Sequence, residues 1–256
     1  VQGRACSRAT SPGSFAGMCG RFVSSTPPDQ LAKYFGADLG VAELAEEPSA
    51  DFNVAPTKAV LTVYESSGTR HLERFHWGLV PFWAKDPKIG NRMINARAET
   101  LAEKNAYKRS YAKRRCIVPV DGFYEWQTIE GRKIKQPVFI SRVDGEPLAF
   151  AGLWASWTDE SHLDDHGEPM ELLSCTIITG DANETIAPVH DRMPVVLPPD
   201  AWDAWLDRDN HDIRSLDQLL VPAPEGLLQL RPVSTEVNNV RNNGPHLIDE
   251  IDPDAD

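Results

Sequence analysis

Short apolar runs separated by tight polar turns recur along most of the chain. The clearest pair flanks Ser66-Ser67-Gly68, a spacing and composition typical of a β-hairpin. Two further turn signals, Glu130-Gly131 and Asp144-Gly145, separate later runs in the same way. Many short strands and few long helices predict one α+β domain, mainly antiparallel, with a barrel-like sheet and flanking helices. The predicted strands are 59–64, 70–77, 116–120, 123–127, 138–142, 148–154, 172–179 and 227–233.

Helical signals are fewer and mostly short. Thr26 is a candidate N-cap, Pro27 suits the first turn, and Gly36 is expected to end the helix. A second helix is predicted from about Glu99 to Lys113. Further short helices are expected at 181–186, 199–206 and 215–220.

Three polar segments are predicted to lie outside the packed domain, which we place at 18–237. Residues 1–17 lack the apolar stretch of a secretory signal and are read as a disordered leader or tag. Residues 156–171 are acidic and are expected to form a mobile insert. Residues 238–256 are polar, end in acids, and are expected to be a disordered tail.

The net charge of −12 argues against general nucleic-acid binding, but the charge is unevenly distributed. Residues 85–115 carry ten Lys or Arg against three Asp or Glu. Such a segment is either a solvated helix face or a track for phosphates. No apolar run in the sequence approaches the roughly 20 residues that a membrane-spanning helix needs, so we expect no membrane partner.

The four cysteines lack C-x-x-C or zinc-type spacing, which fits a reducing, cytoplasmic compartment and predicts no metal or cofactor. Cys116 and Cys175 lie in apolar runs and are expected in the core. Cys19 differs because it follows Met18. Removal of that Met would leave an α-amine and a thiol on adjacent carbons, a pair that traps aldehydes. If the upstream residues stay attached, Cys19 has no free amine.

Seven motifs in order carry a resemblance to a known family. They are Met18-Cys19-Gly20-Arg21-Phe22, Phe52-Asn53-Val54-Ala55-Pro56, Trp77-Gly78-Leu79-Val80-Pro81, Asn95-Ala96-Arg97-Ala98-Glu99-Thr100, Gly122-Phe123-Tyr124-Glu125-Trp126, Ala151-Gly152-Leu153-Trp154 and His190-Asp191-Arg192-Met193-Pro194. Together they resemble the SOS response-associated peptidase (SRAP) family, whose members process abasic sites in DNA. The resemblance implies a compact mixed fold rich in antiparallel sheet. It also implies a covalent cross-link through the N-terminal Cys at abasic sites in single-stranded DNA.

Candidate catalytic roles follow from the side chains. The α-amine of Cys19 would attack the open-chain aldehyde, and its thiolate would close a thiazolidine ring. Glu125, among aromatics, is the candidate acid and base, or else an ordinary polar strand residue. His190 is the second proton carrier, or a loop His satisfied by Asp191. Asn95 would hold the Cys19 amine, or cap the following helix.

The predicted DNA contacts are two cations and two aromatics. Arg21 and Arg97 would bind flanking phosphates, or pair with core carboxylates. Trp77 and Phe82 would stack beside the missing base, or belong to the core. The predicted partner is single-stranded DNA with abasic sites, bound by a monomer. Two other functions stay open: a thiol peptidase that processes its own N-terminus, and a non-covalent single-strand binder.

Overall fold

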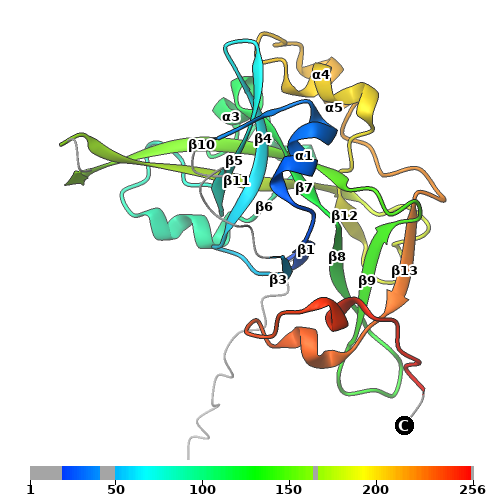
Figure 1. Cartoon of the computed structure of the whole chain (residues 1–256). Coiled ribbons are helices and arrows are strands. Elements are labelled where there is room, and N and C mark those ends of the chain that lie inside the picture. The colour runs from blue at the N-terminus through cyan, green and yellow to red at the C-terminus, as the bar shows by residue number, and fades with distance from the viewer. Residues whose placement is uncertain (1–18, 41–49, 164–166, 255–256) are drawn as a thin grey trace, which may run out of the picture.

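Two β-sheets form the framework of the computed structural model, which describes residues 19–40, 50–163 and 167–254 (Figure 1). One sheet has the order β13-β9-β8-β1-β3, and the other has β12-β11-β10-β7-β4-β5-β2 with β6 paired to β11. The strands are β1 (Phe22–Ser24), β2 (Asp38–Leu39), β3 (Asp51–Val54), β4 (Ala59–Ser66), β5 (Thr69–Trp77), β6 (Asn95–Arg97), β7 (Arg115–Val120), β8 (Gly122–Gln127), β9 (Gln136–Arg142), β10 (Leu148–Leu163), β11 (Pro169–Asp181), β12 (Arg192–Pro194) and β13 (Leu228–Pro232).

Helices are short. They are α1 (Pro28–Phe35), α3 (Lys108–Lys113), α4 (Trp202–Leu206) and α5 (Ile213–Asp217), with the 3-10 helices η1 (Pro87–Arg92), η2 (Ala98–Thr100), η3 (Pro199–Ala201), η4 (Thr235–Asn238) and η5 (Pro245–Ile248). Of these, η4 and η5 pack against the five-stranded sheet. Within the described ranges, no helix has the length and apolar character needed to cross a membrane.

The larger sheet closes on itself, which confirms the predicted barrel-like α+β fold. Antiparallel pairings join β11 to β10, β10 to β7, β7 to β4 and β4 to β5. A parallel pairing of β5 with β11, at Trp77 and Cys175, completes the ring. The predicted hairpin turn is also present, since Ser67 and Gly68 have φ of 55° and 77°, as a two-residue hairpin loop requires.

Helix α1 ends as predicted but begins differently. Gly36 has φ 61° and closes the last turn with its amide. The cap position is occupied by Pro27, and no side chain caps the helix. Thr26 instead donates its amide and hydroxyl to the Asp121 carboxylate. The cap prediction was wrong because the helix begins at Pro28, so Pro27 and not Thr26 stands at the cap position, while Thr26 binds the Asp121 carboxylate at the corner between β7 and β8.

The long helix predicted from Glu99 to Lys113 is interrupted. Only η2 and α3 are helical, and turns connect them. Leu101 and Tyr107 are buried in the core, and the Tyr107 hydroxyl donates to the Asn95 carbonyl over 3.3 Å. Tertiary packing of these side chains overrides the local helical pattern.

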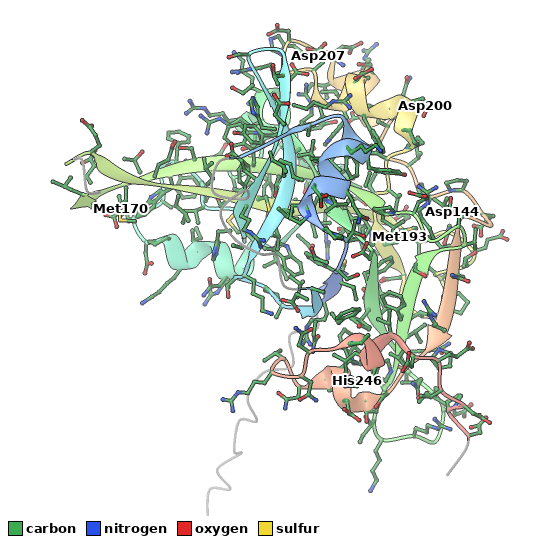
Figure 2. All side chains as sticks on the ribbon, viewed as in Figure 1. Asp144, Met170, Met193, Asp200, Asp207 and His246 are labelled. Atoms are coloured by element: carbon green, nitrogen blue, oxygen red, sulfur yellow. The ribbon has the colours of Figure 1, made fainter. Side chains whose placement is uncertain are left out.

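In the described parts of the acidic segment, residues 156–163 and 169–171 extend the β10–β11 ladder and do not form a separate insert. Trp157 pairs with Leu172 and Asp159 with Met170. The hairpin projects away from the barrel, and Met170 lies near its far end (Figures 1 and 2). The Trp157 indole also donates to the Ala84 carbonyl over 2.7 Å. Ladder hydrogen bonds come from the main chain, so polar side chains did not prevent strand formation.

The predicted disordered tail is wrong for residues 238–254. Val237 and Leu247 are fully buried, and the Ile251 amide donates to the Pro232 carbonyl over 3.0 Å. In Figure 1 this part of the chain lies below the five-stranded sheet. A few well-spaced apolar residues are enough to bury an otherwise polar segment. The leader prediction for 1–17 lies outside the described residues.

We expect Leu247→Ala to lower the free energy of unfolding by about 2–4 kcal/mol, because it empties a buried site. Val240→Ala, in the same segment at a half-exposed position, should change it by less than about 0.5 kcal/mol. Chemical denaturation of both variants tests this. Equal effects would mean that the segment does not contribute to the packed core.

Candidate active site

A buried hydrogen bond joins the two strongest candidate residues. The Cys19 nitrogen donates to Glu125 Oε1 over 2.6 Å. Strand β1 pairs antiparallel with β8, and the Arg21 carbonyl accepts the Tyr124 amide over 2.9 Å. That register brings the residues just before β1 to the second half of β8. The pairing of two strands about a hundred residues apart therefore sets the contact.

Glu125 is almost completely buried, with 4% of its surface exposed. Burial raises the pKa of its carboxyl to about 7, although hydrogen bonds from the Cys19 and Trp126 amides and the charge of Lys135 act in the opposite direction. Desolvation disfavours the carboxylate and is the largest effect. A carboxyl that titrates near neutrality can both accept and donate a proton at cellular pH.

The Cys19 thiol is also buried, and its backbone has φ 45°. Burial, followed by the proximity of Glu125, raises the pKa of this thiol well above its ordinary value. Cys19 therefore rests as a thiol, and a nearby base has to remove its proton before it attacks. Glu125 is positioned next to the same residue.

His190 lies just before β12 and has two contacts at one nitrogen. Nδ1 accepts the Arg192 amide over 3.1 Å and lies 2.9 Å from Asp191 Oδ1. Nδ1 cannot accept and donate at once, so the contacts belong to different protonation states. Neutral His190 accepts from Arg192 and carries its proton on Nε2. When Nδ1 carries a proton, it donates to Asp191, which is the alternative role that the sequence analysis gave His190.

Strand β11 brings the Asn95 and His190 motifs to one place. Asn95 pairs with Ile177 on β11, and β12 pairs with the end of β11 from Thr179 to Asp181. Met193 of β12, labelled in Figure 2, packs in the same apolar cluster as Cys19. The structure thus places the two motifs beside one strand, next to the Cys19 cluster.

Arg192 was given no role from the sequence, yet it links two motifs. Its guanidinium binds the Glu99 carboxylate at 2.6 and 3.0 Å and donates to the Thr179 carbonyl over 2.7 Å. The bidentate pair holds η2 against β11 and β12. The sequence held one signal for this pair, since Glu99 and Arg192 carry opposite charges and each lies in one of the seven motifs.

The two predicted phosphate-binding arginines differ in environment. Arg97 is exposed at the end of β6. Arg21 is partly buried, and its NH1 donates to Asn53 Oδ1 over 2.6 Å and to the Val237 carbonyl over 2.8 Å. Burial lowers the pKa of Arg21. Part of its guanidinium is therefore committed to contacts within the protein.

The two aromatic residues predicted to contact DNA, Trp77 and Phe82, differ strongly in exposure. Trp77 is fully buried, its indole donates to the Ile94 carbonyl over 3.0 Å, and its ring lies 4.9 Å from that of Phe22. A ring without an exposed face cannot stack on a base, so the prediction that Trp77 contacts DNA is wrong for this structure. Phe82 is 56% exposed and lies under the Arg109 guanidinium. Trp83, its exposed neighbour, was missed although it lies in the same aromatic loop.

In the described part of the chain, no cluster of three or more His, Cys, Asp or Glu is arranged to hold a metal ion.

Comparisons with known proteins identify the family of the chain. The model of the SOS response associated peptidase (SRAP) family matches residues 18–240. The abasic site processing protein YoqW of Bacillus subtilis is 40% identical over 232 residues, covering 91% of this chain and 99% of that protein. The Escherichia coli protein YedK, also named an abasic site processing protein, is 32% identical and covers 91% and 100%.

A solved structure gives the same answer for the fold. A Bacteroides thetaiotaomicron protein superposes with a TM-score of 0.78 at 25% identity, covering 91% of this chain and all of that one. The overall fold is thus shared with a solved structure. The chain belongs to the SRAP family.

The buried carboxyl makes stability depend on pH in a defined direction. The folded-state pKa of about 7 lies above the ordinary value, so folding is favoured at low pH and this contribution is lost as pH rises through 7. Relative to Glu125→Gln, the wild type should lose about 2–3 kcal/mol of unfolding free energy between pH 5 and 8.

Denaturation at a series of pH values measures this difference. Glu130→Gln, at an exposed position, is the matched control and should track the wild type across the range. A difference between Glu125→Gln and the wild type that does not change with pH would show that Glu125 titrates normally.

Proposed function

We propose that the protein recognises abasic sites in single-stranded DNA and forms a covalent thiazolidine cross-link through Cys19. One observation carries the proposal: the Cys19 nitrogen lies 2.6 Å from a buried carboxyl that titrates near pH 7. In a chain that begins at Cys19, this nitrogen is the α-amine. The names of the YoqW and YedK relatives support the choice of lesion.

The proposed reaction starts with proton transfer from the Cys19 ammonium to Glu125. The free lone pair bonds to the aldehyde carbon of the opened sugar, and the carbonyl oxygen leaves as water after accepting protons, which gives an imine. The Cys19 sulfur then bonds to the imine carbon, and the thiol proton ends on the ring nitrogen. Because amine and thiol share one residue, ring closure needs no second encounter.

His190 would assist the sugar rather than the amine. In its neutral form the Nε2 proton is available to the ring oxygen of the closed sugar, while Nδ1 is held by the Arg192 amide at 3.1 Å. Asn95, on strand β6 beside β11, would hold the Cys19 amine with its side-chain oxygen.

A track for the DNA backbone would follow the basic segment. Arg97 is exposed near the site, and Phe82 offers an exposed ring next to Arg109. Arg21 would contribute through the part of its guanidinium that the protein does not hold. The exposed cations of the segment are Lys85, Lys88, Arg92, Arg97, Lys104, Lys108, Arg109 and Lys113. A binder without covalent chemistry would use the same track and would not discriminate the lesion.

The adduct is measured on protein whose chain begins at Cys19, mixed with a single-stranded oligonucleotide that carries one abasic site. We expect a heat-stable species at protein plus DNA minus one water, absent with undamaged DNA. Cys19→Ala and Cys19→Ser should form no thiazolidine, whereas Cys116→Ala, which removes a buried thiol elsewhere, should react normally.

Glu125→Gln and His190→Ala should slow the same reaction by about 100-fold or more, since each removes a proton carrier. An adduct that forms equally well with Cys19→Ala would refute the mechanism. Salt-sensitive binding with no adduct from any variant would favour the non-covalent binder.

A second candidate, self-cleavage between Met18 and Cys19, is favoured by the position of Glu125. The peptide nitrogen of that bond donates to the carboxyl, which could protonate it as the leaving amine, and Cys19 has an unfavourable positive φ. The Cys19 sulfur would bond to the Met18 carbonyl carbon as the C–N bond breaks, which leaves a thioester and a free amine on Cys19. Water would then hydrolyse the thioester, releasing residues 1–18 as a carboxylic acid and restoring the thiol.

If this activity exists, purified protein carrying residues 1–18 should lose them on incubation, and Glu125→Ala should prevent the loss. Intact mass spectrometry over time follows the reaction. A wild-type chain that keeps residues 1–18 would exclude self-processing.

A further inference from the structure

The far side of the catalytic strands is covered by residues 234–251, here called the C-terminal clasp. On β8, Phe123 and Glu125 lie on the face toward Cys19, whereas Tyr124 and Trp126 lie on the opposite face. Val237 and Leu247 of the clasp are fully buried against that opposite face. Figure 1 shows the segment beside β8 and β9, and Figure 2 labels His246 within it.

One buried amide ties the clasp to the rest of the protein. Asn53 on β3 is 1% exposed, and its Nδ2 is within hydrogen-bond distance of three clasp carbonyls. These belong to Val237 (3.3 Å), Asn239 (3.1 Å) and Asn242 (2.9 Å). Its Oδ1 accepts from Arg21 over 2.6 Å. Asn53 therefore uses both ends of its side chain inside the protein.

The clasp also holds the residues that flank the catalytic pair. Arg21, two positions after Cys19, donates to the Val237 carbonyl over 2.8 Å. Trp126, directly after Glu125, donates its indole N–H to Asn238 Oδ1 over 2.6 Å. The Arg21 guanidinium also lies 5.8 Å from the Trp126 ring. The clasp thus binds both β8 and the residues just before β1, on the face of the sheet opposite Glu125.

We propose that Asn53 is a positioning residue for the Cys19–Glu125 pair, acting through the C-terminal clasp. This inference rests on the proposed function for its catalytic consequence but not for its structural one. With the clasp in place, β1 and β8 cannot separate, so the 2.6 Å contact is held and water is kept from the carboxyl. Asn53 touches no reacting atom.

The expected consequence is large because reactivity depends steeply on geometry. A displacement of about 1 Å can cost about 100-fold in rate. Asn53→Ala removes the acceptor for Arg21 and the donor for three carbonyls in one step. Asn53→Asp keeps an acceptor for Arg21 but removes the donors, so it isolates the contribution of the clasp.

The first test uses the full chain and needs no DNA. The Glu125 carboxyl is titrated by NMR with 13C-labelled glutamate and assigned with Glu125→Gln. In this structure the groups acting on it are the Cys19 and Trp126 amides, Lys135 and the Cys19 thiol, all unchanged by the substitution. We expect the midpoint to fall by about 1 pH unit in Asn53→Ala as water reaches the carboxyl. Asn53→Asp adds an anion, which acts on the midpoint in the opposite direction, so this variant is used only in the rate measurement. Val240→Ala, in the clasp but half exposed, should keep the wild-type midpoint.

The second test measures adduct formation with chains that begin at Cys19. At saturating DNA, Asn53→Ala should react about 10- to 100-fold more slowly, while the half-saturating DNA concentration changes by less than about 2-fold. Leu216→Ala, at a buried position in the cluster around the barrel, is the control for lost stability alone. Equal slowing by Leu216→Ala at equal loss of stability would overturn the proposal.

If Asn53→Ala does not fold, Asn238→Ala replaces it, because Asn238 is exposed and touches Trp126 directly. It should lower the Glu125 midpoint in the same direction, and an unchanged midpoint would overturn the inference. A wild-type protein that forms no adduct would refute the proposed function, and the titration would still decide the role of Asn53.

Discussion

The structure depends on a carboxyl group kept almost dry beside the first described residue. A buried carboxylate is costly unless a donor meets it, and the Cys19 nitrogen does so over 2.6 Å. Two features maintain this hydrogen bond. The pairing of β1 with β8 sets the register of the two residues, and the apolar cluster around Cys19 excludes water. Removing the donor would leave the carboxyl neutral, and removing the apolar cover would leave it an ordinary acid.

Because side chains alternate along β8, one face of the strand contacts Cys19 and the other contacts the clasp. Glu125 faces the reacting residue, and Trp126 faces the segment that holds the strand in place. Arg21 shows that this division is incomplete, because a cation expected to bind DNA is also bound to the Val237 carbonyl. A substitution of Arg21 would therefore remove contacts that hold the clasp, and a loss of DNA binding in such a variant would not by itself show that Arg21 contacts phosphate.

Sequence reasoning found the barrel-like sheet and the hairpin at Ser67-Gly68, because a tight turn is a local signal. The hairpin expected at Asp144-Gly145 was wrong, since this turn joins β9 to β10, which lie in different sheets and do not pair. Sequence reasoning failed where distant residues decide the outcome. Trp77 lies in an aromatic loop typical of a binding surface, yet its ring is fully buried against Phe22. The clasp was misjudged for the same reason, since the burial of Leu247 depends on Asn53 and Tyr124, which no window around residue 247 contains.

The separation of the contacting residues has a consequence for biosynthesis. Cys19 leaves the ribosome before its partner Glu125, which follows 106 residues later. The Val237 carbonyl that anchors Arg21 follows that arginine by 216 residues, which corresponds to roughly 10 to 40 s of translation. Glu125 therefore emerges about halfway through that interval, before the segment that binds Arg21 has been made. The contacts around Cys19 are complete only after Val237 has been synthesised, so a chain that ends before this residue carries Cys19 and Glu125 without the carbonyl that holds Arg21.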